Sequence, residues 1–225
     1  MTITYHRELE QGSADWLQAR CGLLTASEMK LILSPTLKAA SNDKERAHVA
    51  ELAAQRITRH VEPHYIGDDQ LRGYEDEITA RALYSERYGE VEEVGFVTND
   101  RWGFTIGCSP DGLVGADGMI ECKSRRQKFQ VETIATGKVP DDFTLQVQTA
   151  LLVTERDWID FVSYSGGLPM ATIRVEPDPA VQAAIVAAAT AFEERVAAKV
   201  DAYAAALASP ARLIPTERKI FEEMF

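Results

Sequence analysis

The chain has 225 residues, of which 45% are hydrophobic and 26% are charged, and its formal net charge is −11. These values are typical of a globular protein with a substantial core, and they exclude a fibrous, collagen-like or disordered chain. The excess of acids also argues against a protein that simply coats nucleic acid, because neutralising phosphates needs lysine and arginine in excess.

No uninterrupted run of about 18 apolar residues occurs, as a membrane span would need. The N-terminus, MTITYHRELEQG, lacks the basic and hydrophobic segments of a signal peptide. The cysteines, Cys21, Cys108 and Cys122, are odd in number and lack CxxC spacing, which argues against a disulfide framework and against a zinc site. We therefore expect a cytoplasmic protein that does not enter a membrane.

Helical patterns dominate residues 1–90. Thr25, followed three residues later by Glu28, is a capping-box pattern that begins a helix, and Pro35 marks its end. The other helical stretches show apolar residues at helical spacing, with Pro63 closing the third and Gly89 the fourth. We expect four helices here, over residues 13–20, 25–34, 42–60 and 73–89.

The fourth of these helices is rich in both acidic and apolar residues. Its apolar residues recur at helical spacing, so one side of the helix should pack against the rest of the protein. This apolar side is predicted to consist of Ile78, Ala82 and either Leu83 or Tyr84.

The pattern changes to strands after residue 90. Short runs of Val, Phe, Thr and Ile from Val91 to Lys123 are broken by ND, DG and GADG, which are turn signals between strands. A helix over DDFTLQVQTALLVTE and two strands, WIDFVSYS and MATIRVE, follow. Asp178 and Pro179 then form an N-cap and first turn for a long Ala-rich helix that Pro210 ends.

This order of elements predicts an α/β protein with a mixed central β-sheet flanked by helices. We interpret residues 1–225 as a single domain, since neither an internal repeat nor a low-complexity linker interrupts the chain. Its parts would be a helical N-terminal part over 1–90, a sheet core over 91–176, and a long C-terminal helix over 179–209 followed by a tail.

The stretch SPDGLVGADGMIECKS contains the residues with the clearest chemistry. If it forms a hairpin, the alternation of a strand puts Glu121 and Lys123 on the face opposite Ile120 and Cys122. Asp111, at the start of the hairpin, could then converge with Glu121 on a shared cation, because Mg²⁺ and Mn²⁺ prefer carboxylate, carbonyl and water oxygens. Lys123 would orient a water or stabilise phosphoryl charge. By itself, the pattern is also common on solvated hairpins.

A second group of residues near the N-terminus suits an anion. With Thr25 as cap, Ser27 lies in the first turn of its helix, where unpaired backbone N–H groups and the helix dipole favour negative charge. Arg20 could supply a guanidinium to the same anion. From the residues alone, a surface charge for Arg20 and an ordinary helix start for Ser27 are the favoured explanations.

Five strings in order resemble the lambda-exonuclease and YqaJ-type viral recombinase family: WLQARCGLLTASE, GYEDEITARALY, CSPDGL, ECK and QVQTALLVT. Asp111 followed by Glu121-x-Lys123 also resembles the PD-(D/E)xK nuclease signature. The resemblance extends over residues 12–165 and implies a restriction-endonuclease-like core.

The family places a further glutamate of the metal site on the helix before the sheet, in the pattern Gly, three residues, Glu, then Ala-Arg. Counting from Gly73 selects Glu77, with Glu75 as the alternative, and the two side chains diverge by about 200° on a helix, so only one can face the site. The resemblance then implies a metal held by the following set: Glu77, Asp111, Glu121 and the backbone carbonyl of Cys122.

Two glutamines on the predicted helix over residues 141–155 compete for one role. Gln146 lies at the edge of an apolar stripe, where a glutamine needs a polar partner, whereas Gln148 points well away from it. In the family the matching glutamine lies near the metal-bound water, so the resemblance favours Gln146 as the partner of Lys123. The stripe consists of Phe143, Val147, Ala150 and Thr154.

The family also binds the 5′-phosphate of a DNA end in a pocket formed by an arginine, two serines and a basic residue after the ExK motif. Here the gap between Glu121 and Gln146 is shorter than in lambda exonuclease, so counting does not identify the basic residue. Arg125, Arg126 and Lys128 all remain candidates, with Arg126 preferred. The predicted phosphate-binding residues are Arg20, Ser27, Ser109 and Arg126.

By resemblance, the chain would be a Mg²⁺-dependent 5′–3′ exonuclease that acts on double-stranded DNA ends and leaves 3′ single-stranded overhangs for recombination. Mn²⁺ would substitute for Mg²⁺. A single-strand annealing protein would be its partner, and a ring-like trimer would provide processivity. Two alternatives stay open: a related endonuclease or single-strand nuclease with the same core, and a DNA-end binding module without turnover.

Overall fold

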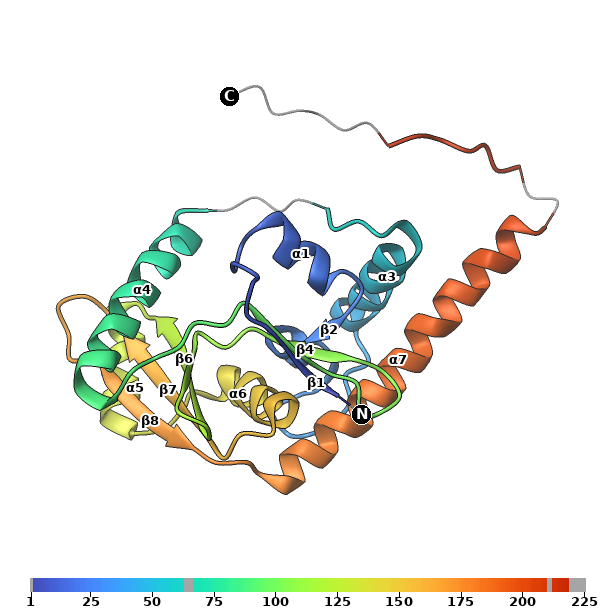
Figure 1. Ribbon diagram of the computed structural model, residues 1–225. Coiled ribbons are helices and arrows are strands. Elements are labelled where there is room, and N and C mark those ends of the chain that lie inside the picture. The colour runs from blue at the N-terminus through green and yellow to red at the C-terminus, as the bar shows by residue number, and fades with distance from the viewer. Residues whose placement is uncertain (1, 63–66, 210–211, 219–225) are drawn as a thin grey trace.

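The computed structural model describes residues 2–62, 67–209 and 212–218. Two four-stranded sheets, each with parallel and antiparallel pairs, form the centre, and helices cover them (Figure 1). The predicted mixed α/β architecture is therefore confirmed. Pro63 and Pro210, the predicted ends of two helices, lie outside the described residues. Within the described ranges, no helix is both long and apolar enough to cross a membrane.

The first sheet joins the N-terminal part of the chain to the predicted sheet core. Its strand order is β1 (Ile3–His6), β3 (Phe96–Asn99), β4 (Ile106–Cys108) and β2 (Leu24–Thr25), and only the β2–β4 pair is parallel. The sequence pattern did not predict β1 or β2, because strands of four and two residues are too short to show alternation. Their partners, distant in the sequence, impose the extended conformation.

The second sheet contains the SPDG hairpin. Its order is β5 (Gly112–Val114), β6 (Gly118–Ser124), β7 (Trp158–Tyr164) and β8 (Ala171–Val175). The β5–β6 hairpin and the β7–β8 pair are antiparallel, as expected, whereas β6 and β7 run parallel. A parallel pair needs a long crossover connection, and here two helices between β6 and β7 supply it.

Helix α4 (Asp68–Tyr88) covers one face of this sheet. Ala80 and Tyr84, one turn apart, pack against a buried cluster on β6 and β7. The predicted apolar side of this helix is wrong apart from Tyr84, because Ile78 is 61% exposed and Ala82 and Leu83 are also exposed. The helix also begins five residues before Gly73. The cluster that α4 covers consists of Ile120, Cys122 and Val162.

The remaining N-terminal helices follow the sequence signals closely. Helices α1 (Ala14–Arg20) and α3 (Asp43–Thr58) lie where they were predicted, and the Thr25–Glu28 capping box is present. The helix after Thr25 is shorter than predicted: a three-residue turn of 3-10 helix, η1 (Ala26–Glu28), leads into the four-residue α2 (Met29–Ile32).

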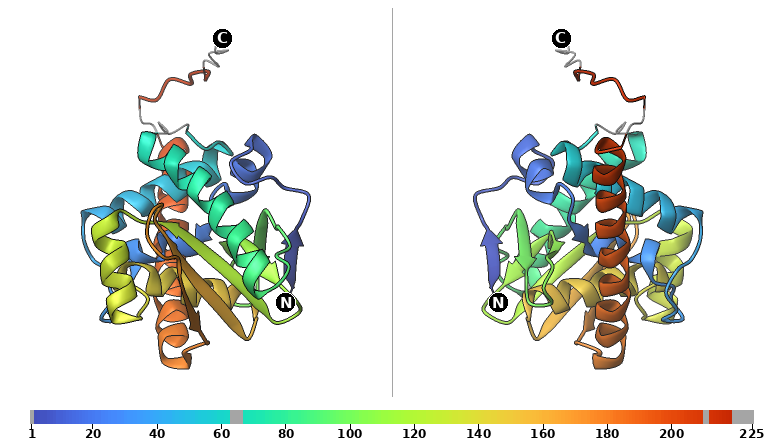
Figure 2. Two further views of the ribbon diagram at one scale, coloured as in Figure 1. Left: turned by 90° about the vertical axis from the view of Figure 1, so that its left-hand side faces the viewer. Right: turned by 90° about the vertical axis from the view of Figure 1, so that its right-hand side faces the viewer.

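Helices of the C-terminal half complete the layers. Helix α5 (Gln127–Thr136) was not predicted, whereas α6 (Asp141–Thr154) was, and α6 packs between the first sheet, η1 and α7. Helix α7 (Pro179–Leu207) begins at its predicted N-cap, Asp178. It runs along the side of the molecule opposite α4, so the two helices face the viewer in different panels of Figure 2.

A buried ionic hydrogen-bond network ties α4 to the second sheet. The Tyr84 hydroxyl donates to Oδ2 of Asp160 at 2.6 Å, and Arg174 donates from Nε and Nη2 to both carboxylate oxygens at 2.9 Å. Asp160 is only 3% exposed, so its charge depends on these donors. The network therefore holds α4 against β7 and β8.

We predict that Tyr84→Phe lowers the free energy of unfolding by about 1.5–3 kcal/mol, because a buried carboxylate loses one of its donors. Urea denaturation measures this change. Tyr88→Phe is the matched control, because Tyr88 lies on the same helix and is 57% exposed. Equal stability of Tyr84→Phe and wild type would contradict a supporting role for the network.

Candidate active site

A cavity of about 180 Å³ lies where α1, η1, α4, β6 and α6 meet. Its wall joins segments that are far apart in the sequence, including the loop between β4 and β5. Most of the predicted site residues line this one cavity. They are Arg20, Ser27, Glu77, Ser109, Asp111, Glu121, Lys123 and Gln146.

Asp111 and Glu77 form an interacting pair of carboxyl groups in this cavity. Asp111 is 6% exposed, and its Oδ2 accepts the backbone N–H of Cys122 at 2.5 Å, which fixes it against β6. Burial, together with the charge of Glu77 on α4, raises the pKa of Asp111. Glu75, the alternative to Glu77, is exposed and does not line the cavity.

The third carboxyl group, Glu121, is held by a lysine and a glutamine. Its side chain is on the same face of β6 as that of Lys123, and Lys123 Nζ lies 2.5 Å from Glu121 Oε1. The amide of Gln146 donates to the same oxygen from α6. Gln148 points elsewhere, since its amide donates to the carbonyl of Glu176 at 2.8 Å. The geometry therefore agrees with the choice of Gln146.

Burial shifts the pKa values of the charged groups in this cluster. It raises the pKa of Glu121 to about 7 and also raises the pKa values of Asp111 and Glu77. Burial by itself would lower the pKa of Lys123, but the charges of Glu121 and Asp111 outweigh it, so the pKa is raised. Three carboxyl groups thus surround Lys123, and a bound cation would favour their ionised forms.

The donor set fits Mg²⁺ or Mn²⁺. It offers carboxylate oxygens from Glu77, Asp111 and Glu121, and the described lining includes no histidine. Cys108 also lines the cavity, but burial raises the pKa of its thiol, which disfavours the thiolate that a softer metal would need. Among the described residues, no three His, Cys, Asp or Glu side chains are grouped closely enough to hold a metal by themselves. Such a set suits an ion that keeps several waters and takes only one or two carboxylates directly, as Mg²⁺ does.

The other end of the cavity is cationic. Arg20 donates to Ser109 Oγ at 3.3 Å and to Thr25 Oγ1 at 3.2 Å, and its guanidinium lies 4.3 Å from the ring centroid of Trp16. Burial lowers the pKa of Arg20, although an arginine remains charged at neutral pH. Ser27 is exposed, with its Oγ 3.3 Å from Thr25 Oγ1. One guanidinium and two serine hydroxyls therefore border the same space.

The helix that begins at Thr25 is too short to support the dipole argument for Ser27. Its 3-10 turn has three residues and the α-helix that follows has four. A macrodipole sums over many aligned peptide units, so attraction for an anion here must come mainly from the guanidinium of Arg20.

The structure does not bring every predicted residue to the cavity. Arg126 is the exposed N-cap of α5, and neither Arg125 nor Lys128 lines the cavity. Arg125 instead packs over the rings of Phe129 and Phe143, 5.1 and 5.0 Å from their centroids. The thiol of Cys122 faces α4, so only the backbone of Cys122 is available to the site.

Three residues of the site were not predicted from the sequence. Trp16 Nε1 donates to Ser109 Oγ at 3.0 Å, and Gln11 donates to the carbonyl of Pro110 at 3.0 Å, so both orient the SPDG loop. Arg81 donates to the carbonyl of Asp111 at 3.0 Å. Of these three residues, Arg81 belongs to the Ala-Arg pair of the sequence pattern that identified Glu77.

Comparisons with known proteins identify the family of the chain and solved structures with a similar fold. The family model described as YqaJ-like viral recombinase domain matches residues 15–157. The structure of an alkaline exonuclease, LHK-Exo, from Laribacter hongkongensis has 34% identity and a TM-score of 0.78, covering 87% of this chain and 98% of that chain. Its complex with dAMP matches over the same shares, with 35% identity and a TM-score of 0.77.

A phage related exonuclease from Haemophilus somnus 129PT has 15% identity and a TM-score of 0.56, over 80% of this chain and 96% of that chain. At this identity the likeness concerns the fold alone. No curated protein matches the chain significantly.

We predict that Glu121→Gln stabilises the metal-free protein above pH 7. The folded protein holds the Glu121 proton up to about pH 7, whereas the unfolded chain releases it near its ordinary pKa of about 4.3. The free energy of unfolding therefore falls as pH rises between these values, by about 3–4 kcal/mol. Glutamine removes this loss.

Thermal unfolding in EDTA from pH 5 to pH 8 measures the effect. Glu75→Gln is the matched control, because Glu75 is exposed on α4. If the melting temperatures of Glu121→Gln and wild type follow the same pH dependence, Glu121 is not the group that opposes folding.

Proposed function

We propose, from the premise that the chain belongs to the YqaJ-like viral recombinase domain family, that it is a Mg²⁺-dependent 5′–3′ exonuclease acting on double-stranded DNA ends. The observation that carries the proposal is a single cavity with a carboxylate–lysine cluster at one end and a guanidinium with serine hydroxyls at the other. The relative with 34% identity is an alkaline exonuclease and has been captured with dAMP, a nucleoside monophosphate of the kind that such an enzyme would release.

In this proposal the carboxylate end holds the metal. Glu77, Asp111 and Glu121, with the backbone carbonyl of Cys122, would bind Mg²⁺, and Mn²⁺ would substitute. The bound ion would lower the pKa of a water and neutralise charge on the scissile phosphate. Lys123, already 2.5 Å from Glu121 Oε1, is a cation that can orient the attacking water. The cluster therefore performs hydrolysis without a covalent intermediate.

Gln146 has the second positioning role. Its amide nitrogen donates to Glu121, and its carbonyl oxygen can accept a hydrogen bond from a water. Two groups, Lys123 and Gln146, would then fix the water in line with the bond to be broken. In-line positioning and charge neutralisation at phosphorus supply most of the acceleration in reactions of this kind.

The guanidinium end recognises the strand terminus. Arg20, Ser27 and Ser109 would bind the 5′-phosphate, since a guanidinium and hydroxyl donors match its oxygens. Arg126 would assist only from the rim, because its exposed side chain lies at the start of α5. A strand held by its 5′ end loses its terminal nucleotide first, so digestion proceeds 5′ to 3′ and leaves a 3′ overhang.

The 3′ overhang defines the expected partners. A single-strand annealing protein would take the exposed strand for homologous recombination in the cytoplasm. A ring-like trimer would keep the duplex enclosed, which suits a chain whose net charge of −11 leaves little basic surface for a DNA track.

The proposal is tested with three substrates: linear duplex with a 5′-phosphate, the same duplex with a 5′-hydroxyl, and closed circular duplex, each with and without Mg²⁺. We expect mononucleotides from the phosphorylated linear duplex with Mg²⁺ only. Rapid cleavage of closed circles would instead identify an endonuclease, and preference for single strands would identify a single-strand nuclease. Binding to DNA ends without release of nucleotides would identify a DNA-end binding module.

We predict that Lys123→Ala and Asp111→Ala each reduce nucleotide release at least about 100-fold, because each removes a group that positions water or metal. Lys138→Ala is the control, since Lys138 is exposed at the end of α5 and does not line the cavity. Unchanged Mg²⁺-dependent release by both variants would rule out this mechanism.

Arg20→Ala should remove the preference for a 5′-phosphate. The loss of charged hydrogen bonds to the phosphate corresponds to about a 10- to 100-fold lower kcat/KM on phosphorylated ends, with little change on 5′-hydroxyl ends. Arg87→Ala, on the exposed side of α4, is the control. A variant at Arg20 that keeps the full preference would contradict the assignment of the phosphate pocket.

A further inference from the structure

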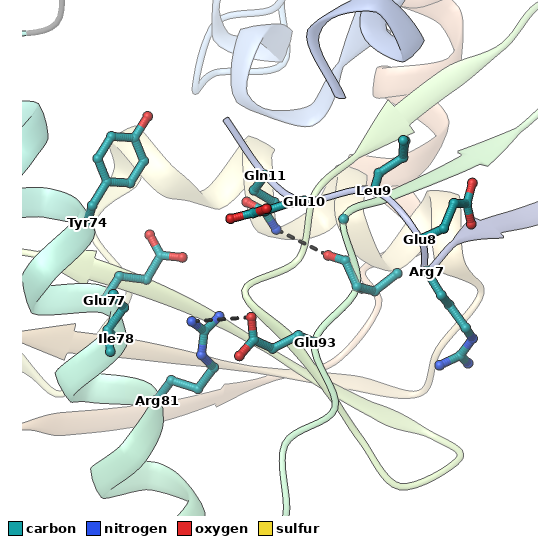
Figure 3. A pocket seen from close by; sticks show the side chains of 12 residues that line it. Arg7, Glu8, Leu9, Glu10, Gln11, Tyr74, Glu77, Ile78, Arg81 and Glu93 are labelled. Atoms are coloured by element: carbon teal, nitrogen blue, oxygen red, sulfur yellow. Dashed lines mark hydrogen bonds and ion pairs between the residues drawn. The ribbon is translucent and has the colours of Figure 1, made fainter. Parts of the chain in front are cut away.

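A second and larger cavity adjoins the candidate active site. This cleft, of about 450 Å³, lies between α4 and the two segments over residues 7–11 and 93–95 (Figure 3). Gln11 and Glu77 line both the cleft and the active-site cavity. A substrate held at Glu77 therefore has direct access to the cleft, which is large enough for a small ligand.

Tyr74 borders the cleft one turn of α4 before Glu77. Its side chain is 50% exposed. Tyr74 also lines two smaller cavities, one that contains Arg20 and one that contains Lys123. The ring therefore lies next to the active-site cavity, near both the residues that suit a terminal phosphate and the residues that suit hydrolysis.

The ring of Tyr74 has no specific interaction with the other described side chains. Among the described residues, Tyr74 stacks on no other ring, lies under no cation and forms no hydrogen bond through its hydroxyl. Trp16 is different, because Arg20 covers its face and its Nε1 donates to the carbonyl of Gly95. Phe143 packs against Phe161, with ring centroids 5.4 Å apart. Of these aromatic side chains near the site, Tyr74 alone presents an open face.

Away from Glu77, the charges of the cleft disfavour a phosphate as the group that contacts the ring of Tyr74. Four glutamates and two arginines line the cleft, and both arginines are already paired. Arg7 forms an ion pair with Glu92, and Arg81 lies 3.6 Å from Glu93. An acidic cleft whose cations are engaged repels phosphate. It accepts an uncharged, flat group instead, and a nucleobase is such a group. The lining glutamates are Glu8, Glu10, Glu77 and Glu93.

We propose that Tyr74 is a positioning residue whose ring stacks on the base of the 5′-terminal nucleotide, the one to be released, with the cleft receiving that base. The inference rests on the proposed exonuclease function, which puts the terminal phosphate at Arg20 and the scissile phosphate at Glu77. The nucleoside between these two phosphates must then pass Tyr74. Stacking on an aromatic ring tolerates any base, because every base has a π-face, so Tyr74 positions the strand without selecting a sequence.

The first test compares Tyr74→Ala, Tyr74→Phe and wild type on 5′-phosphorylated duplex whose terminal nucleotide is either normal or abasic. Single-turnover release of the first nucleotide is measured. On the normal end, Tyr74→Ala should be about 5- to 150-fold slower, as expected for loss of one base–aromatic stack, and Tyr74→Phe should match wild type. On the abasic end, all three proteins should be equal.

A second measurement does not need turnover. A 2-aminopurine at the 5′-terminal position loses fluorescence when it stacks on a ring. In EDTA, binding of this duplex should quench the fluorescence with wild type and Tyr74→Phe but not with Tyr74→Ala. Tyr203→Ala is the control in both experiments, because Tyr203 is 46% exposed on α7 and lines none of these cavities.

The results separate the two proposals. Tyr74-dependent quenching without nucleotide release would overturn the exonuclease and keep the stacking role. Release by wild type that Tyr74→Ala does not slow would overturn the role of Tyr74. An equal loss on normal and abasic ends, or a changed oligomeric state of Tyr74→Ala, would also overturn it, because the ring would then support the fold or a contact between subunits.

Discussion

Three carboxyl groups are buried around Lys123, and their mutual repulsion governs how this site is built. Asp111 and Glu121 are 6% and 3% exposed, and Glu77 reaches Asp111 from a separate helix. Such a cluster opposes folding when it is ionised and empty. A bound cation would offset the repulsion between the carboxylates. The ionised, metal-free form of the site is therefore its least stable form.

Strand β6 and the helices α4 and α6 place the residues of this cluster. Strand β6 places Glu121 and Lys123 on one face while its other face packs under α4, whose buried residues Ala80 and Tyr84 leave Glu77 directed at the same place. The parallel pairing of β6 with β7 requires a crossover, and that crossover returns α6 over the site with Gln146 facing Glu121. The crossover between β6 and β7 therefore supplies both α6, as a wall of the cavity, and the amide of Gln146.

The site contains both a positive and a negative region, although the net charge of the chain is strongly negative. An acidic protein carries one guanidinium, Arg20, at the end of the cavity opposite the carboxylates. Two phosphates of one strand could be held by opposite means, one by a guanidinium and one by a metal. In the proposed complex the nucleoside between them would contact the ring of Tyr74, which would link recognition of the terminus to the position of the bond that is cut.

Several local features could be predicted from the sequence: the N-cap Asp178, the Thr25–Glu28 capping box, and the alternation that puts Glu121 and Lys123 on one face. These depend on near neighbours along the chain. Tertiary contacts, in contrast, bury one side of α4, join β1 and β2 to a sheet, and leave Arg126 outside the cavity. Burial and strand pairing depend on partners far away in the sequence, and no local pattern contains them.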